Sequence, residues 1–255
     1  MSSHAATDRL KVSRYYRSSF GAFGPGGISP VVKTLIIISS TAFLLQIFDS
    51  IAGGATFISK FGLVPYQVSH RFYLWQLVTY IFLHGGFLHI LFNMLGLWMF
   101  GTDLERLWGS RPFAKFFFIC GIGGAVSKTL LNPASQQTTI GASGAILGIL
   151  VAYAFLFPDR MIILYIFPIK VKWFVIGTAA FTVLSSIQDG GSTDYRVHLG
   201  GMLCALLYMK GRRVVTDLKW HYDRWHRNRL RRKFDVYYNE RHRDDDQERW
   251  RRWKN

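Results

Sequence analysis

Charge is scarce and unevenly placed in this 255-residue chain. Only 18% of the residues are Asp, Glu, Lys or Arg and half are apolar, whereas a soluble domain usually has about a quarter charged residues. No charged residue occurs in 72–102 or in 129–158, yet the net charge is +16. Sixteen of the 31 Lys and Arg fall in 210–255. A soluble nucleic-acid-binding protein would mix its basic residues with its core, so the pattern favours a membrane protein and argues against a nucleic-acid partner.

Cysteine is almost absent as well. Cys120 and Cys204 both lie in apolar stretches, so there is no disulfide framework to build, and we expect small packing residues. His221, His226 and His242 lack the spacing to acids or cysteines that a zinc site needs. We therefore expect no metal and no cofactor.

Six apolar stretches predict membrane-spanning helices, which need about 20 apolar residues each. They cover residues 34–52, 87–102, 112–131, 141–157, 172–187 and 197–210. Several are short, which a bundle or a locally thinned bilayer tolerates. The apolar segment 161–168, bounded by two prolines, predicts a re-entrant or interfacial connector.

The distribution of Lys and Arg predicts the orientation of these helices, because cytoplasmic loops are enriched in both. With six spans and the N-terminus inside, 27 Lys and Arg lie on the inner side and four on the outer side. We therefore expect both termini in the cytoplasm. No signal-peptide pattern precedes the first stretch, and without a transit peptide this favours a bacterial plasma (inner) membrane. The outer segment 53–86 is apolar and aromatic over 72–83, so we expect it at the outer leaflet.

Polar residues within three of the apolar helices are candidates for a functional site, since such groups are costly in a bilayer. His84, His89 and Asn93 accompany the second helix, and the last two share one helix face. Ser143 opens the fourth helix and His198 the sixth. These three helices all run from the outside inward, so His89, Ser143 and His198 should meet at one shallow depth on the outer side.

These residue types together suit nucleophilic catalysis. A serine hydroxyl is a weak nucleophile until an imidazole removes its proton, and amide or imidazole N–H groups can stabilise the oxyanion that forms. Small residues at 144 and 148 beside Ser143, and at 201 and 205 beside His198, allow two helix backbones to approach closely. Taken singly, a serine in a spanning helix is usually a packing residue and a histidine a structural donor. Their co-occurrence at one depth favours catalysis.

These residues resemble the rhomboid family over about 30–210. The family's motifs appear in order as HGGFLHILFNM, DLERLWGS, GASGA and VHLGG. The resemblance implies an all-α polytopic membrane protein, a six-transmembrane-helix rhomboid-like bundle that uses a Ser–His dyad without an acidic third member. It divides the chain into a cytoplasmic N-terminal segment (1–30), a protease core (31–210) and a basic cytoplasmic tail (211–255).

The resemblance also assigns roles by position. It implies that Ser143 is the nucleophile, His198 the general base, and His89 with Asn93 the oxyanion-binding groups. Residues expected to support the site are His84, Gly141, Gly144 and Gly201. Glu105 and Gly109 match a family turn after the second helix.

Two positions depart from the family's pattern. Gln76 stands where many members have Arg, which bears on contacts within the outer segment. Leu147 stands where some members have a Tyr that stacks on the histidine, so we expect apolar packing to hold His198.

The expected reaction is hydrolysis of peptide bonds in or near transmembrane segments of membrane proteins. One alternative is a catalytically inactive rhomboid-like protein that binds clients; another is a channel or transporter, which would show repeats and broken helices at the midplane. The basic tail is expected to bind anionic lipid headgroups, at about 1 kcal/mol per nearby basic residue, the alternative being an acidic partner or nucleic acid. The sequence does not specify an oligomeric state.

Overall fold

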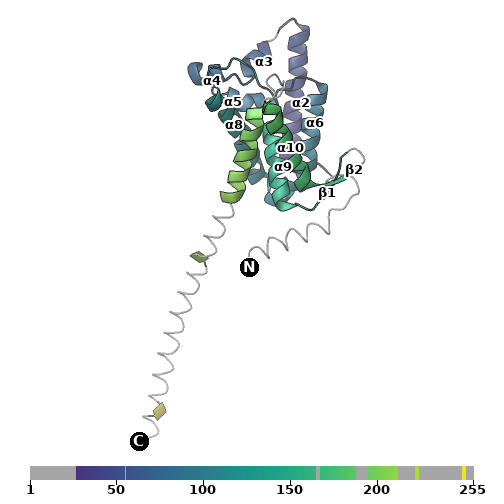
Figure 1. Cartoon of the computed structure of the whole chain (residues 1–255), viewed down its shortest axis with the longest axis vertical. Coiled ribbons are helices and arrows are strands. Elements are labelled where there is room, and N and C mark those ends of the chain that lie inside the picture. The colour runs from purple at the N-terminus through teal and green to yellow at the C-terminus, as the bar shows by residue number, and fades with distance from the viewer. Residues whose placement is uncertain are drawn as a thin grey trace. The chain divides into compact units, whose positions relative to one another are not determined.

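The structure is a computed structural model that describes residues 27–54, 56–164, 167–187, 195–211, 222–223 and 249–250. Most of these residues are helical (Figure 1). The expectations for the N-terminal segment, and for lipid binding by the basic tail, concern residues that lie almost entirely outside the described ones.

Three helices of 22 residues are long and apolar enough to cross a membrane. They are α2 (Pro30–Ile51), α8 (Ser110–Leu131), and the continuous helix Phe87–Trp108. The third consists of α6 (Phe87–Gly96), a π-helical turn η2 (Leu97–Gly101) and α7 (Thr102–Trp108). At 1.5 Å per residue each is about 33 Å long, close to the hydrocarbon thickness of a bilayer. The chain is therefore an integral membrane protein.

Three shorter helices complete the described bundle. They are α9 (Ser143–Leu156), α10 (Val171–Ile187) and a helix over residues 195–211. The predicted helix boundaries are met within four residues, except that the second helix continues six residues beyond its predicted end at 102. His84, which was expected to belong to that helix, lies before it in a non-helical segment.

The connector between α9 and α10 is a β-hairpin. Strands β1 (Met161–Leu164) and β2 (Phe167–Lys170) pair antiparallel, with Met161 opposite Lys170. The sequence predicted a re-entrant or interfacial segment here. A two-stranded ladder leaves backbone groups unpaired at both edges, and such edges are not tolerated where they face lipid. The structure thus shows that the connector is a hairpin, and its place relative to the membrane stays a prediction.

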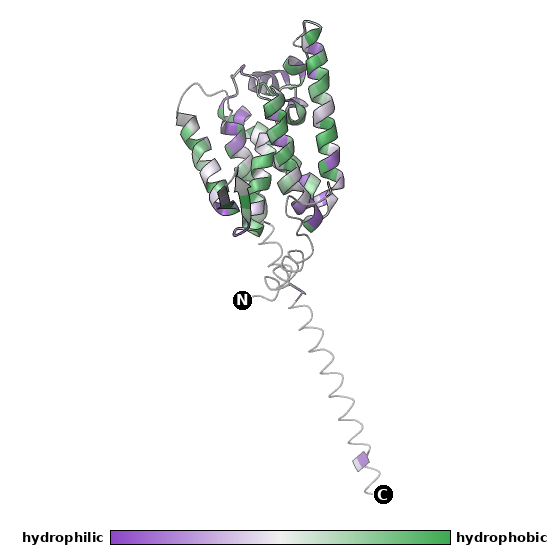
Figure 2. Cartoon of the chain, turned by 90° about the vertical axis from the view of Figure 1, so that its right-hand side faces the viewer, coloured by the Kyte–Doolittle hydropathy of each residue, from purple (hydrophilic) through white to green (hydrophobic). Residues whose placement is uncertain are grey.

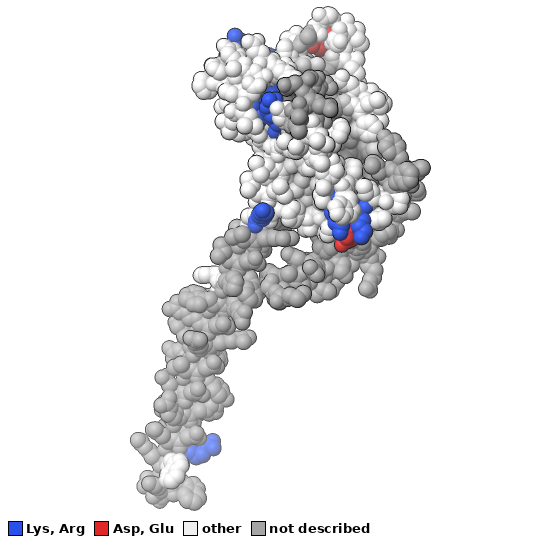
Figure 3. Space-filling model, in the orientation of Figure 1, with Lys and Arg blue, Asp and Glu red and all other residues white. Residues whose placement is uncertain are grey.

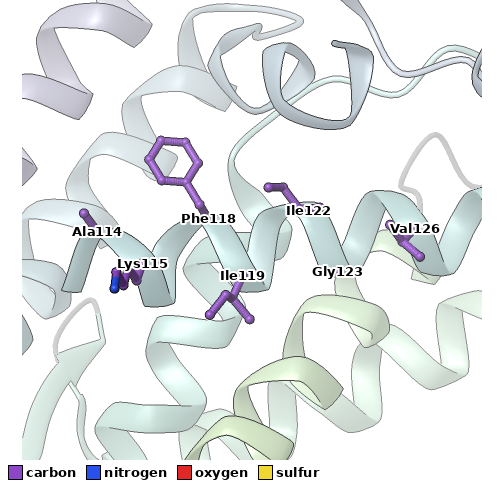
Figure 4. A pocket seen from close by; sticks show the side chains of 7 residues that line it. All are labelled: Ala114, Lys115, Phe118, Ile119, Ile122, Gly123 and Val126. Atoms are coloured by element: carbon purple, nitrogen blue, oxygen red, sulfur yellow. The ribbon is translucent and has the colours of Figure 1, made fainter. Parts of the chain in front are cut away.

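The surface of the bundle is that of a membrane protein. Apolar side chains face outward along α2, where Leu44, Phe48 and Ile51 are exposed, and Figure 2 shows that the helices consist largely of hydrophobic residues. On the face in Figure 3, the described charged residues gather toward the two ends, with an uncharged band between them. An apolar groove of about 640 Å³ runs along α8 beside Phe118, Ile122 and Val126 (Figure 4).

The outer segment forms a layer of short helices at the end of the bundle opposite the hairpin (Figure 1). These are α3 (Thr56–Phe61), α4 (Pro65–Arg71), α5 (Gln76–Thr79) and the 3₁₀ turn η1 (Tyr80–Phe82). Gln76 is fully buried and organises the layer: its Oε1 accepts from the Val64 N–H (3.0 Å), and its Nε2 donates to Gln67 Oε1 (2.6 Å). Gln76, which stands where many members of the resembled family have Arg, thus makes hydrogen bonds within the outer segment.

A buried carboxylate ties the opposite end of the bundle together. Glu105 accepts hydrogen bonds from the Ser29 hydroxyl (2.5 Å), the Ser110 hydroxyl (2.7 Å) and the backbone N–H groups of Val31 (2.9 Å) and Val32 (3.0 Å). The two N–H groups belong to the first turn of α2, where no intrahelical acceptor exists. Glu105 therefore caps α2 and joins it to the α7–α8 turn.

Replacing Glu105 with Ala should lower the free energy of unfolding by about 3 kcal/mol, because four donors in a buried site lose a charged acceptor. Thermal unfolding in detergent micelles, followed by tryptophan fluorescence, measures the effect. Asp159→Asn is the control, since that carboxylate is exposed and pairs with Lys172 in solvent. Equal melting temperatures for the two variants would show that the Glu105 network does not stabilise the bundle.

Candidate active site

Ser143 and His198 are in direct contact, although 55 residues separate them in the sequence. Ser143 is the first residue of α9, and His198 lies in the first turn of helix 195–211. The Ser143 Oγ is 2.6 Å from His198 Nε2. Both residues are partly exposed, so a reactant and water can approach. This distance permits transfer of the hydroxyl proton to the imidazole.

Glycines bring the two helices close enough for this contact. A Cβ at Gly201 would lie 2.2 Å from the Gly144 carbonyl oxygen, and one at Gly144 would lie 3.0 Å from the Val197 carbonyl oxygen. No side chain fits in either space, so α9 and helix 195–211 touch backbone to backbone. The small-residue packing expected from the sequence is therefore present.

A third helix supports the same junction. A Cβ at Gly148 would lie 2.6 Å from Cys120 Sγ of α8, and one at Gly124 of α8 would lie 2.6 Å from the Val197 carbonyl oxygen. Helices α8, α9 and 195–211 consequently meet around Val197, which is the residue before His198 and is buried. The backbone at Val197, and with it the start of the helix that carries His198, is therefore packed against both α8 and α9.

His89 approaches Ser143 from α6. An added Cβ at Gly141 would lie 2.8 Å from His89 Nε2 and 3.9 Å from Ser143 Oγ, so the space above Gly141 is bounded by both groups. The Gly85 N–H donates to His89 Nδ1 (3.3 Å). Because Nδ1 accepts, the proton of the neutral ring is on Nε2. His89 therefore points an N–H donor toward the space beside Ser143.

Asn93 lies one turn further along α6 and is buried. Its side-chain Nδ2 donates to the His89 carbonyl oxygen at 2.7 Å. This bond holds the amide against its own helix and uses one of its two N–H donors. The structure thus places Asn93 beside His89 without recording a contact to Ser143.

His84 is buried beside His89, and the two rings meet edge to face with centroids 5.2 Å apart. Its Nδ1 lies 3.2 Å from the Phe82 carbonyl oxygen. Burial, and then the proximity of His89, lower the pKa of His84 to about 4. This imidazole is consequently neutral at neutral pH.

The loop before Ser143 is held by residues that the sequence did not point to. The Gly141 N–H donates to the Tyr80 carbonyl oxygen (2.9 Å), and the Tyr80 hydroxyl donates to the Gly121 carbonyl oxygen of α8 (2.6 Å). Buried Lys128 Nζ donates to the Gln137 carbonyl oxygen (3.3 Å) and to the Thr139 hydroxyl. The sequence did contain one signal for Lys128, namely a charged residue near the end of an otherwise apolar predicted helix.

Comparison with known proteins gives the family. A family model described as Rhomboid domain matches residues 71–213, which is more than half of the chain. The chain belongs to the rhomboid family. Within the described residues, no group of three His, Cys, Asp or Glu side chains has the arrangement of a metal site.

The chain is similar to several named rhomboid proteins. It is 32% identical over 155 residues to the mitochondrial Rhomboid protein 1 of Saccharomyces cerevisiae, covering 57% of this chain and 45% of the relative. It is 31% identical over 163 residues to Rhomboid protease GluP of Bacillus subtilis, covering 63% of this chain and 30% of the relative. RHOMBOID-like protein 5 of Arabidopsis thaliana is 34% identical over 93 residues, 36% of this chain and 30% of the relative. The matched region spans less than half of each of these relatives.

One departure from the family's pattern lies beside the dyad of this rhomboid protein. Leu147 is in α9, one turn after Ser143, and belongs to the buried apolar core. The expectation that apolar packing holds His198 at this position stays a prediction.

Gly141→Ala should lower the reaction rate of Ser143 by about 100-fold, because the new methyl group enters the space toward which His89 points its donor. The second-order rate of labelling by a fluorophosphonate probe measures this effect without a known substrate.

Gly53→Ala is the matched control for this substitution. Gly53 has a φ of +78° and Gly141 one of +124°, but an added Cβ at Gly53 meets nothing within 4 Å. Both variants carry the strain of a side chain at positive φ, which costs on the order of 1–3 kcal/mol. Similar labelling rates for the two would mean that the space above Gly141 is not used.

Proposed function

We propose that this rhomboid protein is an intramembrane serine endopeptidase in which Ser143 is the nucleophile and His198 the general base. The observation that carries the proposal is the 2.6 Å contact between Ser143 Oγ and His198 Nε2. An inactive client-binding protein has no need of a nucleophile and base in hydrogen-bonding contact at a partly exposed position.

The reaction would proceed through an acyl-enzyme. The Ser143 hydroxyl proton moves to His198 Nε2 as Oγ attacks the scissile carbonyl carbon, and the carbonyl oxygen becomes an oxyanion. His198 then gives that proton to the leaving amine as the C–N bond breaks. Water, deprotonated by His198, attacks the ester, and the serine leaves with the proton returned to it.

The oxyanion would be stabilised by donors of three kinds. The backbone N–H of Ser143 stands at the N-terminus of α9, where helix N–H groups lack intrahelical acceptors and the dipole favours negative charge. His89 Nε2–H faces the same space through Gly141. Asn93 would add its second N–H, since its first is bonded to the α6 backbone. Donors fixed in advance in a site of low dielectric lower the barrier without reorganisation.

The substrates would be membrane proteins cut within or next to a transmembrane segment. Ser143 opens α9, His89 lies in the first turn of the span Phe87–Trp108, and both stand toward the layer of short outer helices. A site at this end is reached from the water–membrane boundary. A peptide bond there has to leave its helix to be attacked, because helical carbonyls are hydrogen-bonded.

We further propose six crossings with both termini on the cytoplasmic side of a bacterial inner membrane. The charge distribution supports this orientation, with 27 Lys and Arg on the inner side against four on the outer. The named relatives include a bacterial protease and a mitochondrial protein.

Labelling of the detergent-solubilised protein with a fluorophosphonate probe tests the catalytic proposal. Wild type should be labelled, Ser143→Ala should not be labelled at all, and His198→Ala should react at least about 1,000-fold more slowly, since the base is lost. Ser59→Ala, an exposed serine of α3, is the control and should behave as wild type. An unreactive wild type, tested beside an active membrane serine protease, would favour the inactive client-binding function.

Reporter fusions test the topology. Alkaline phosphatase is active only outside the bacterial cytoplasm, so a fusion after Gly54 should be active and a fusion after Asn255 inactive. Green fluorescent protein at the same two positions should give the opposite pattern. Phosphatase activity at Asn255 would contradict an even number of spans with both ends inside.

A further inference from the structure

Gln46 makes a paired hydrogen bond to the backbone of His84. The residue lies in α2 and is buried, with 6% of its surface exposed. Its Oε1 accepts from the His84 N–H at 3.0 Å, and its Nε2 donates to the His84 carbonyl oxygen at 3.0 Å. The amide therefore satisfies both backbone groups of one residue, as a neighbouring β-strand would.

The backbone that Gln46 holds leads directly to the candidate oxyanion donor. The amide plane that follows the His84 carbonyl carries the Gly85 N–H, and this N–H donates to His89 Nδ1. Because a peptide unit is planar, the direction of the His84 carbonyl fixes the direction of the Gly85 N–H. Gln46 consequently constrains the group that sets the tautomer and the orientation of the His89 ring.

The His84 side chain reinforces this arrangement. Its ring is almost fully buried and packs edge to face against His89. Gly85 itself is exposed and glycine is conformationally permissive, so the segment 84–86 has little stiffness of its own. Gln46 of α2 therefore holds this segment in place through its two hydrogen bonds to the His84 backbone.

We infer that Gln46 is a positioning residue for the oxyanion site: by clamping the His84 backbone from α2, it holds the Gly85 N–H on His89 Nδ1 and so aims His89 Nε2–H at the tetrahedral intermediate. The inference rests on the proposed function, and assigns α2 a part in the reaction although it carries none of the reacting groups.

Two substitutions separate positioning from general stability. Gln46→Leu removes both hydrogen bonds. Gln46→Glu restores them only when the carboxyl group is protonated, since the acid then donates to the His84 carbonyl and accepts from the His84 N–H, whereas the carboxylate can only accept. Burial raises the pKa of such a carboxyl. The protonated form, which makes both hydrogen bonds, therefore gives way to the carboxylate, which can only accept, within the pH range that can be measured. Ser39→Ala, at another buried polar position of α2, is the matched control.

The experiment follows labelling by a fluorophosphonate probe between pH 5 and 9 and separates the limiting rate, kinact, from the half-saturating concentration, KI. Gln46→Leu should lower kinact by about 10- to 100-fold at every pH with KI unchanged, since a misplaced donor costs rate and not binding. The kinact of Gln46→Glu relative to wild type should fall as pH rises through the carboxyl pKa. Ser39→Ala should match wild type throughout.

The outcomes distinguish this inference from the proposed function. If wild type reacts through Ser143 and Gln46→Leu has a kinact within twofold of it, the positioning role is wrong and the protease proposal stands. The same holds if Gln46→Glu is slowed equally at every pH, which is the result of a purely structural defect. If wild type does not react, both fail together.

Discussion

The contact of bare backbones between α9 and helix 195–211 is the constraint on which the candidate site depends. In a bilayer, apolar side chains gain little by leaving lipid for protein, so helices associate through close packing and polar contacts. At Gly144 and Gly201 the backbones lie closer than any side chain permits. The 2.6 Å separation of Ser143 and His198 follows from that approach, because each residue stands within three positions of one of these glycines. The close packing of these two helices therefore determines the contact between Ser143 and His198.

Buried polar groups supply the directional part of the fold. Glu105 binds the first turn of α2, and Asp103 accepts from the Tyr153 hydroxyl (2.9 Å) and from Arg160 (2.6 Å). Both acids lie on α7, so one short helix fixes the register of α2 and of the C-terminal end of α9. Such groups are costly to bury without partners, and each partner they require is a specific atom of another helix. Packing sets how close the helices lie, and these bonds set which residues face each other.

The sequence was informative wherever one residue contrasted with its own neighbourhood. A serine and two histidines in apolar stretches were visible as anomalies, and apolar stretches predicted helices such as α8 and α10 within two residues. The sequence could not show partners that are backbone atoms. The backbone N–H groups that donate to Glu105 lie more than seventy positions away from it, and Gln46 binds the main chain of His84. The hairpin was missed because eight apolar residues between prolines fit several structures. The number of spans and the roles of the site residues remain predictions.

In the proposed protease, the β1–β2 hairpin would also set how deep a substrate can be cut. The lysine residues at 170 and 172 pair there with exposed Asp159, and charged groups of this kind would hold the hairpin at the polar boundary of the membrane. An α9 standing along the membrane normal would rise about 21 Å from that level over its 14 residues, and Ser143 would then lie about 9 Å short of the far boundary of a hydrocarbon layer about 30 Å thick. A substrate helix in the same bilayer would present at that height a bond about six residues below its outer end. In the proposed reaction the length of α9 would thus act as a ruler along the substrate, and a helix longer by one turn would move the cut toward the surface by about four residues.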